Sequence, residues 1–168
     1  MLRGLQKRRT ILKAVTRQPG MGFIDIMKST GYANGVVSHH LDVLEKEGAI
    51  RISRSKRKIW VFDSQLDSSD DNIRIALRKE TCKEILVFLL ENDIATFVQI
   101  RNAIKKSPGT TSFTLKKLDE LGVLKIIYGF PKKYALKDFE KTSEILDVMA
   151  VSHTDELKDR FADTFSYL

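Results

Sequence analysis

The sequence is poor in the features that build disulfide frameworks and membrane spans. It has one cysteine, Cys82, which excludes an internal disulfide and a cysteine-based zinc cluster, and we expect this residue to be buried in a helix. The longest apolar run is the six-residue segment 85–90, whereas a bilayer span needs roughly 18 apolar residues. The basic N-terminus lacks the apolar stretch of a secretory signal. We therefore expect a cytoplasmic protein that does not enter a membrane.

The familiar motifs of catalysis are also missing from the sequence. It contains no glycine-rich phosphate loop, no HExxH motif and no nucleophile elbow. His39 and His40 are adjacent, but no cysteine or acidic residue lies at metal-ligand spacing from them. We therefore expect neither an enzyme nor a bound cofactor or metal.

What the sequence has is positive charge, unevenly distributed. The net charge is +7. Residues 1–66 carry 13 Lys and Arg against 5 Asp and Glu, residues 67–136 carry 12 against 9, and residues 137–168 carry 4 against 8. A basic first part favours a polyanionic partner, of which nucleic acid is the commonest.

An internal repeat organises the chain. With an offset of 74 positions, GVVSHHLDVLEKEGAI at residues 35–50 falls on GTTSFTLKKLDELGVL at residues 109–124. The alignment continues without a gap, placing Phe23 on Phe97 and the aromatic Trp60 on the aromatic Tyr134. Shared positions are mostly apolar or glycine, so a core and its turns repeat. We infer two copies of one fold of about 60 residues.

The first copy is predicted to fold as three helices and a hairpin. Apolar spacing, with Val37, Leu41 and Leu44 facing inward, and turn residues place the helices at residues 5–17, 23–29 and 34–47. Gly48 is expected to end the third helix as a left-handed residue. Strands are predicted at residues 49–53 and 58–62.

Helix caps and hairpin turns give the second copy clearer boundaries. Ser107 and Pro108 are an N-cap and a first-turn proline for its third helix, and residues 129–131 mark its hairpin tip. In the first copy Ala33 is a poor cap, so we expect Asn34 to cap instead. Residues 63–71 form a polar linker to a long helix that begins near Asn72.

The predicted fold class is mainly α with small β-hairpin wings: two tandem winged helix-turn-helix domains, residues 1–66 and 67–136, plus C-terminal helices that form an extension, residues 137–168. The extension has two apolar stripes, formed by Phe139, Leu146 and Met149 and by Leu157, Phe161 and Phe165. They either pack on the preceding domain or form a dimer contact. We expect a homodimer that pairs through them or through the helix around residues 85–90.

The segment VVSHHLDVLEKEGAIRISRSKRKIWVF, residues 36–62, resembles the ArsR and MarR classes of bacterial and archaeal regulators. The whole chain is similar to archaeal regulators predicted to carry two such domains. The resemblance implies a sequence-specific transcriptional regulator of double-stranded DNA. It is weaker in the second copy, where Phe113-Thr114 replaces His39-His40, and the Cys-x-Cys metal-sensing motif of many ArsR proteins is absent.

A recognition helix needs a short polar face for the major groove, and a wing needs cations for phosphates. The segment RISRSKRK, residues 51–58, has five cations and no acid. The alternative is that these are ordinary solvent-facing residues, while His40 is expected on the core side. The residues predicted to contact DNA are Asn34, Gly35, Val36, Ser38, His39, Lys46, Arg51, Arg54, Lys56, Arg57 and Lys58.

The second copy has fewer cations and more exposed aromatic residues at the equivalent positions. Its predicted contacts, with DNA or with a protein partner, are Thr110, Phe113, Lys116, Lys117, Lys132 and Lys133. Two other functions remain open from the sequence: a tandem winged-helix scaffold for protein interactions, favoured by Phe113, Tyr128 and Phe130, and binding to RNA.

Overall fold

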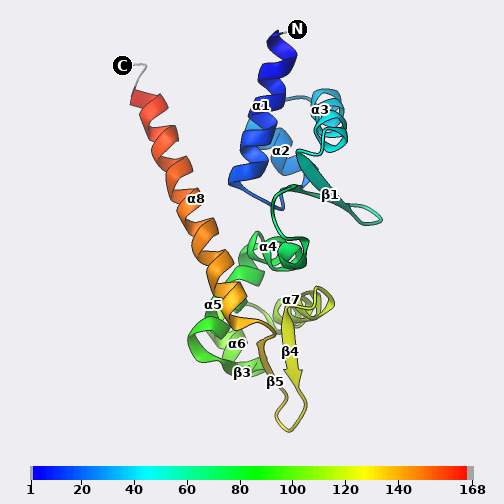
Figure 1. The fold of residues 1–168 in the computed structure, drawn as a ribbon. Helices are drawn as coiled ribbons and strands as arrows, with labels where there is room; N and C mark the ends of the chain where they lie inside the picture. Colours follow the sequence, from blue (N-terminus) through cyan, green and yellow to red (C-terminus); the bar gives the residue numbers. More distant parts are fainter. Residues whose placement is uncertain (1, 166–168) are drawn as a thin grey trace. The chain divides into compact units, whose positions relative to one another are not determined.

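A computed structural model describes the backbone of residues 2–165 (Figure 1). Two compact units form, the first from Met1–Asp71 with Val148–Leu168 and the second from Asn72–Asp147. The helices are α1 (Leu2–Arg17), α2 (Phe23–Thr30), α3 (Asn34–Lys46), η1 (Ser68–Asp70), α4 (Asp71–Leu77), α5 (Glu80–Asn92), α6 (Phe97–Ile104), α7 (Pro108–Glu120) and α8 (Phe139–Phe165). The strands are β1 (Ile50–Arg54), β2 (Ile59–Asp63), β3 (Ile94–Thr96), β4 (Leu124–Ile127) and β5 (Lys133–Leu136).

The first unit packs three helices against a hairpin, as the apolar spacing predicts. Val37, Leu41 and Leu44 of α3 are buried, which confirms their predicted inward side. The rest of this core comprises Ile11, Val15, Met21, Ile26, Ile50 and Val61. Gly48 has a φ of 72°, a left-handed conformation that glycine adopts without strain, so the predicted end of the helix is confirmed.

Strands β1 and β2 form an antiparallel hairpin with Ile50 opposite Asp63 and Arg54 opposite Ile59. Each strand starts and ends one residue later than the sequence predicts. Met21 adds a single bridge to Val61, so this sheet has two full strands. The hairpin tip is residues 55–58, closed by a hydrogen bond from Ser55 N–H to the Lys58 carbonyl at 2.8 Å.

The helix expected to run on from near Asn72 is interrupted, so the prediction of one long helix is wrong. Helix α4 ends at Leu77 and α5 begins at Glu80, because Lys79 takes an extended conformation with φ −101° and ψ 121°. Ile75, Ala76 and Leu77 are buried at the end of α4. Residues are buried on both sides of the break, since α5 also has a buried apolar face. No proline or glycine marks it in the sequence.

The second unit has a three-stranded antiparallel sheet in the order β3-β5-β4. Helix α5 packs on α6, α7 and β5, and it buries Cys82, Ile85, Leu86 and Leu89 in this unit. Cys82 is therefore a buried helical residue, as predicted, and burial raises the pKa of its thiol.

Equivalent elements of the two units lie 74 residues apart. Helices α2 and α3 cover residues 23–30 and 34–46, and α6 and α7 cover residues 97–104 and 108–120. Gly48 and Gly122, also 74 apart, are both left-handed. The chief difference is β3, since residues 20–22, Gly-Met-Gly, give only the single bridge at Met21.

The C-terminal segment is one helix of 27 residues, not several helices. Phe139 is 45% exposed, and Leu146 and Met149 are half-buried. The second predicted stripe, Leu157, Phe161 and Phe165, lies outside the residues whose side chains are described. Among the described helices, none combines the length and apolar character of a membrane span.

Candidate nucleic-acid interface

Helix α3 carries the groove-facing residues predicted from the sequence. Its N-cap is Ala33, in an extended conformation, and no side-chain hydrogen bond caps the helix. The expectation that Asn34 caps is wrong, because Asn34 is already helical and its side chain lies beyond the capping position. Within the described chain, the first turn of α3 therefore keeps backbone N–H groups that no side chain caps.

The outward face of α3 is short and polar toward its N-terminus. Asn34, Gly35, Ser38 and His39 are exposed, and Val36 is half-buried beside them. A Cβ added at Gly35 has nothing within 4 Å, so a neighbouring molecule can approach the backbone closely there. Lys46 is exposed at the other end of the helix. These predicted contact residues thus share one surface.

His40, expected on the core side, is 6% exposed. Its Nδ1 atom has no hydrogen-bond partner among the described residues. Burial, the neighbouring His39 and the cations Arg8 and Lys7 lower the pKa of His40 below its ordinary value of 6.5. The folded unit therefore favours the neutral form of this imidazole, whose ring centre lies 5.1 Å from that of the exposed His39.

We expect His40 to make the first unit acid-sensitive. A lowered pKa means that the unfolded chain binds the proton more tightly. The neutral His40 side chain therefore contributes fully to the stability of the fold above about pH 6.5, and this contribution is lost as the pH falls toward the folded-state pKa. Urea unfolding followed by the fluorescence of Trp60 should show a slope of up to about 1.4 kcal/mol per pH unit in that range. His40→Gln should flatten the slope and the exposed His39→Gln should not; equal slopes in all three proteins would contradict this assignment.

The β1–β2 hairpin tip presents the cations of the predicted wing. Lys56, Arg57 and Lys58 are all exposed. In the described part of the chain no carboxylate forms an ion pair with any of the three. Their charges are therefore available to an external anion, and their mutual repulsion makes such an anion favourable.

Arg54, at the end of β1, is differently placed. Its guanidinium donates two hydrogen bonds to Glu45 of α3, at 2.7 Å from Nη1 to Oε1 and 2.5 Å from Nη2 to Oε2. The hydrogen bonds from Arg54 lower the pKa of Glu45, and those same bonds raise the pKa of Arg54. Glu45, which no sequence pattern marked as a site residue, thus ties the β1–β2 hairpin to α3 and partly neutralises Arg54.

Arg51 has an internal structural role. It donates to both carboxylate oxygens of Asp71, at 2.8 and 3.1 Å, and to the Leu66 carbonyl at 3.1 Å. Its guanidinium carbon also lies 5.4 Å from the centre of the Phe62 ring. Arg51 therefore fastens the segment after the hairpin to β1, and its charge is already compensated, unlike those at the hairpin tip.

Helix α7 of the second unit places different side chains on the equivalent face. Thr110 is engaged in the cap, with its N–H donating to Ser107 Oγ at 3.1 Å, so the predicted Ser107 cap is confirmed. Phe113 is 64% exposed, with Lys117 Nζ 4.9 Å from the ring centre. Lys116 Nζ lies 3.9 Å from Glu120 Oε1. The exposed face of α7 is thus less polar than that of α3, and its lysine charges lie beside a ring or a carboxylate.

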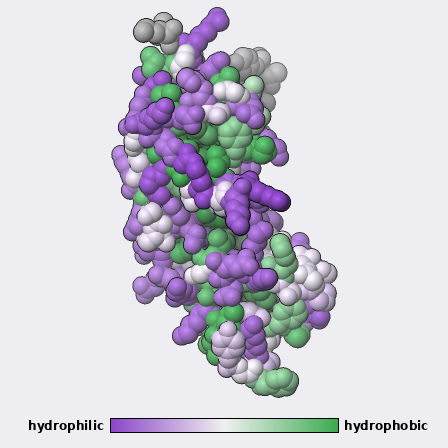
Figure 2. All heavy atoms as spheres, turned by 90° about the vertical axis from the view of Figure 1, so that its right-hand side faces the viewer, coloured by the Kyte–Doolittle hydropathy of each residue, from purple (hydrophilic) through white to green (hydrophobic). Residues whose placement is uncertain are grey.

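The β4–β5 hairpin of the second unit ends in aromatic side chains. Tyr128 is 83% exposed and Phe130 is fully exposed, and Lys132 and Lys133 follow them, also exposed. Green and white side chains gather at the lower end of Figure 2, the end at which Figure 1 draws this hairpin. The two hairpins therefore differ in character: the first is cationic, and the second combines cations with rings.

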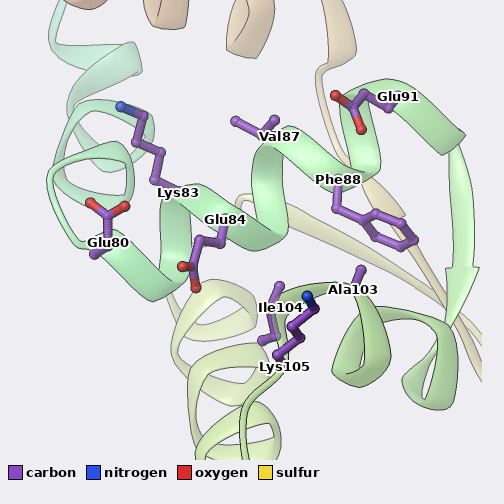
Figure 3. A pocket seen from close by; sticks show the side chains of 9 residues that line it. All are labelled: Glu80, Lys83, Glu84, Val87, Phe88, Glu91, Ala103, Ile104 and Lys105. Atoms are coloured by element: carbon purple, nitrogen blue, oxygen red, sulfur yellow. The ribbon is translucent and has the colours of Figure 1, made fainter.

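A groove of about 620 Å³ lies between α5 and α6 of the second unit (Figure 3). Its apolar floor includes Phe88 and Ile104, and its rim has three glutamates, Glu80, Glu84 and Glu91, against two lysines. This balance of charge is unfavourable for a nucleic-acid backbone. Among the described residues, no group of three or more His, Cys, Asp or Glu side chains is arranged to hold a metal ion.

Part of the chain matches a known protein family. Residues 6–51, from α1 to the second residue of β1, match the helix-turn-helix family described as "Bacterial regulatory protein, arsR family". An uncharacterised HTH-type transcriptional regulator of Methanocaldococcus jannaschii is 26% identical over 118 residues, covering 70% of this chain. The match spans 30% of the length of that relative.

A solved structure of a hypothetical protein from Pyrobaculum spherical virus is also similar to this chain. It is 17% identical, with a TM-score of 0.44, over 84% of this chain and 98% of the viral one.

Proposed function

We propose that this chain is a sequence-specific transcriptional regulator that binds double-stranded DNA through its first unit. Helix α3 enters the major groove, and the β1–β2 hairpin contacts the backbone. Asn34, Gly35, Val36, Ser38 and His39 lie against base edges and nearby phosphates. Lys46, Lys56, Arg57 and Lys58 contact phosphates, and Arg54 adds a weaker contact because Glu45 partly neutralises it. Arg51 supports the hairpin from within. The chain has no enzymatic role in this proposal.

One observation carries the proposal: the short polar face of α3 lies within residues 6–51, which match the arsR family, and the hairpin tip that follows has three cations with no ion-pair partner among the described residues. The polar face offers hydrogen-bonding groups and close backbone approach at Gly35. The cations supply affinity that is independent of base sequence. The name of the Methanocaldococcus jannaschii relative supports a role in transcription.

The second unit, in this proposal, is a second winged helix-turn-helix domain in tandem with the first. Its helices α6 and α7 repeat α2 and α3 at an offset of 74 residues, followed by the same left-handed glycine and a hairpin. Its helix face offers Phe113 and Lys116 in place of His39 and Asp42. We therefore assign it a secondary contact and not the reading of duplex sequence.

The active form is proposed to be a homodimer. One winged unit contacts only a short half-site, and two-fold pairing doubles the sequence that is read. Val148 and Val151 of α8 are 67% and 62% exposed, so this helix has apolar surface available for pairing. A monomer mass in light scattering at every concentration would contradict the dimer without affecting the assignment of α3.

The experiment that tests this function compares two glycines at equivalent positions. Gly35→Leu adds a side chain where a Cβ meets no atom within 4 Å, and Gly109→Leu adds one at a Cβ position whose nearest atom is Ser107 Oγ at 4.0 Å. Neither change should lower stability, because leucine is the better helix former by about 1 kcal/mol. Gly35→Leu should weaken duplex binding about 10-fold or more by holding α3 out of the groove.

Gly109→Leu is the matched control and should leave duplex affinity within about 2-fold of the unchanged protein. Fluorescence anisotropy with a labelled duplex measures both variants, and urea unfolding checks that each is folded. Equal losses in the two variants, or a larger loss for Gly109→Leu, would show that α3 is not the reading helix.

A further inference from the structure

The β4–β5 hairpin exposes more aromatic surface than folding accounts for. Tyr128 is 83% exposed and Phe130 is fully exposed, although rings of this size are ordinarily at least partly covered. Both belong to the turn between Ile127 and Lys133, where no strand pairing requires an aromatic side chain. The exposure of these rings therefore indicates a ligand that covers them.

The charge around these rings selects the chemistry of that ligand. Residues 124–137 contain four lysines, Lys125, Lys132, Lys133 and Lys137, and no acidic residue. Lys132 Nζ lies 5.8 Å from the centre of the Tyr128 ring and 5.5 Å from that of Tyr134. The hairpin thus presents two exposed rings, Tyr128 and Phe130, with an ammonium group beside the first of them.

We propose that this hairpin binds single-stranded DNA, with unpaired bases stacked on Tyr128 and Phe130 and with Lys132 and Lys133 on the adjoining phosphates. Aromatic platforms beside cations are the combination that holds single strands without reading their sequence. Lys132 Nζ lies 5.8 Å from the centre of the Tyr128 ring, and this residue is 83% exposed, so it retains surface for a base. The same ammonium group lies within reach of the phosphate that follows.

Two other occupants fit the hairpin less well. A protein partner favours aromatic residues but disfavours lysine in its contact area, and here Lys132 and Lys133 directly follow the turn that carries the rings. A fully paired duplex keeps its bases stacked on each other, and opening a step costs a few kcal/mol. The proposal goes beyond the duplex-binding function of the first unit, because it concerns a different hairpin and a different ligand.

The test uses the full chain and a fluorescein-labelled single strand of about 12 nucleotides, a length within the range that such sites cover. A second probe has the same length but abasic residues, so that it keeps the phosphates and lacks the bases. A third is the corresponding duplex. The double variant Tyr128→Leu with Phe130→Leu retains apolar bulk and removes the flat rings, and Tyr128→Trp with Phe130→Trp restores them.

We expect the leucine variant to lose affinity for the single strand on the order of 10-fold, and the tryptophan variant to recover it. Affinity for the abasic strand should be low and the same in all three proteins. The triple variant Lys56→Ala, Arg57→Ala and Lys58→Ala should lose the duplex and keep the single strand, so that failure of either proposal is visible separately.

Four results would overturn the proposal. The first is an unchanged affinity of the leucine variant for the single strand, and the second is a loss of equal size on the abasic strand. The third is a loss confined to the duplex, which would make the rings a wedge for paired DNA. Failure of the tryptophan variant to recover affinity would likewise count against stacking. The side chains are exposed, so the circular dichroism spectrum should be identical in every variant.

Discussion

Replacing Lys56, Arg57 and Lys58 together with alanine should reduce affinity for any duplex by several hundred-fold at about 0.1 M salt. Each phosphate contact contributes about 0.9 to the slope of log affinity against log salt, or about 8-fold in affinity at that concentration. The slope should therefore fall by about three units. The three side chains are exposed and lack ion-pair partners in the described chain, so folding should be unaffected. Fluorescence anisotropy titrations over a salt series measure both quantities.

Glu45→Gln, on the same surface, should raise duplex affinity where the triple alanine variant lowers it. It removes the carboxylate that accepts two hydrogen bonds from Arg54, so the guanidinium becomes available to a phosphate. Duplex affinity should rise by up to about 8-fold and the salt slope by about one unit. An unchanged salt slope in the triple alanine variant, or weaker duplex binding by Glu45→Gln, would mean that the β1–β2 hairpin tip does not contact the DNA backbone.

Leu41→Ala should lower the free energy of unfolding of the first unit by about 2–5 kcal/mol. Leu41 is 2% exposed in the core of this unit, and its truncation leaves a cavity that the surrounding helices fill only in part. The single tryptophan, Trp60, lies on β2 of the same unit, so its fluorescence in urea reports this transition. Duplex binding should be lost wherever this unit unfolds.

Leu115→Ala is the matched control, since Leu115 is the equivalent core residue of the second unit and is 3% exposed. It should shift the unfolding seen by circular dichroism and leave the Trp60 midpoint and the duplex affinity nearly unchanged. If Leu115→Ala moved the Trp60 midpoint as far as Leu41→Ala does, the two units would unfold as one and the control would fail.

Much of the fold could be predicted from the sequence by local rules of helix geometry. The inward spacing of Val37, Leu41 and Leu44 follows from the helical period, and the left-handed Gly48 follows from the need to end a helix without strain. Ser107 caps α7 because its hydroxyl lies at the position where a backbone N–H needs an acceptor. These features depend on residues close in sequence, and for that reason the pattern was sufficient.

Features that depend on contacts between residues distant in sequence could not be predicted. Arg51 and Arg54 have the same chemistry in the sequence, yet one pairs with Asp71, 20 residues away, and the other with Glu45, nine residues away. No local signal distinguishes such pairs, because the rotation of a strand decides which face meets a carboxylate. The break at Lys79 is similar, since burial on both sides sets it and no proline or glycine marks it.

The central claim, that α3 reads the base sequence of a duplex, is tested most directly by selecting bound sites from a library of random duplexes. The unchanged protein should enrich a defined short sequence, and His39→Ala should alter the preferred base at one or two of its positions, with about 1–3 kcal/mol at stake for each. Enrichment of no sequence by the unchanged protein, or the same preferred sequence from both proteins, would contradict this account of α3 and His39.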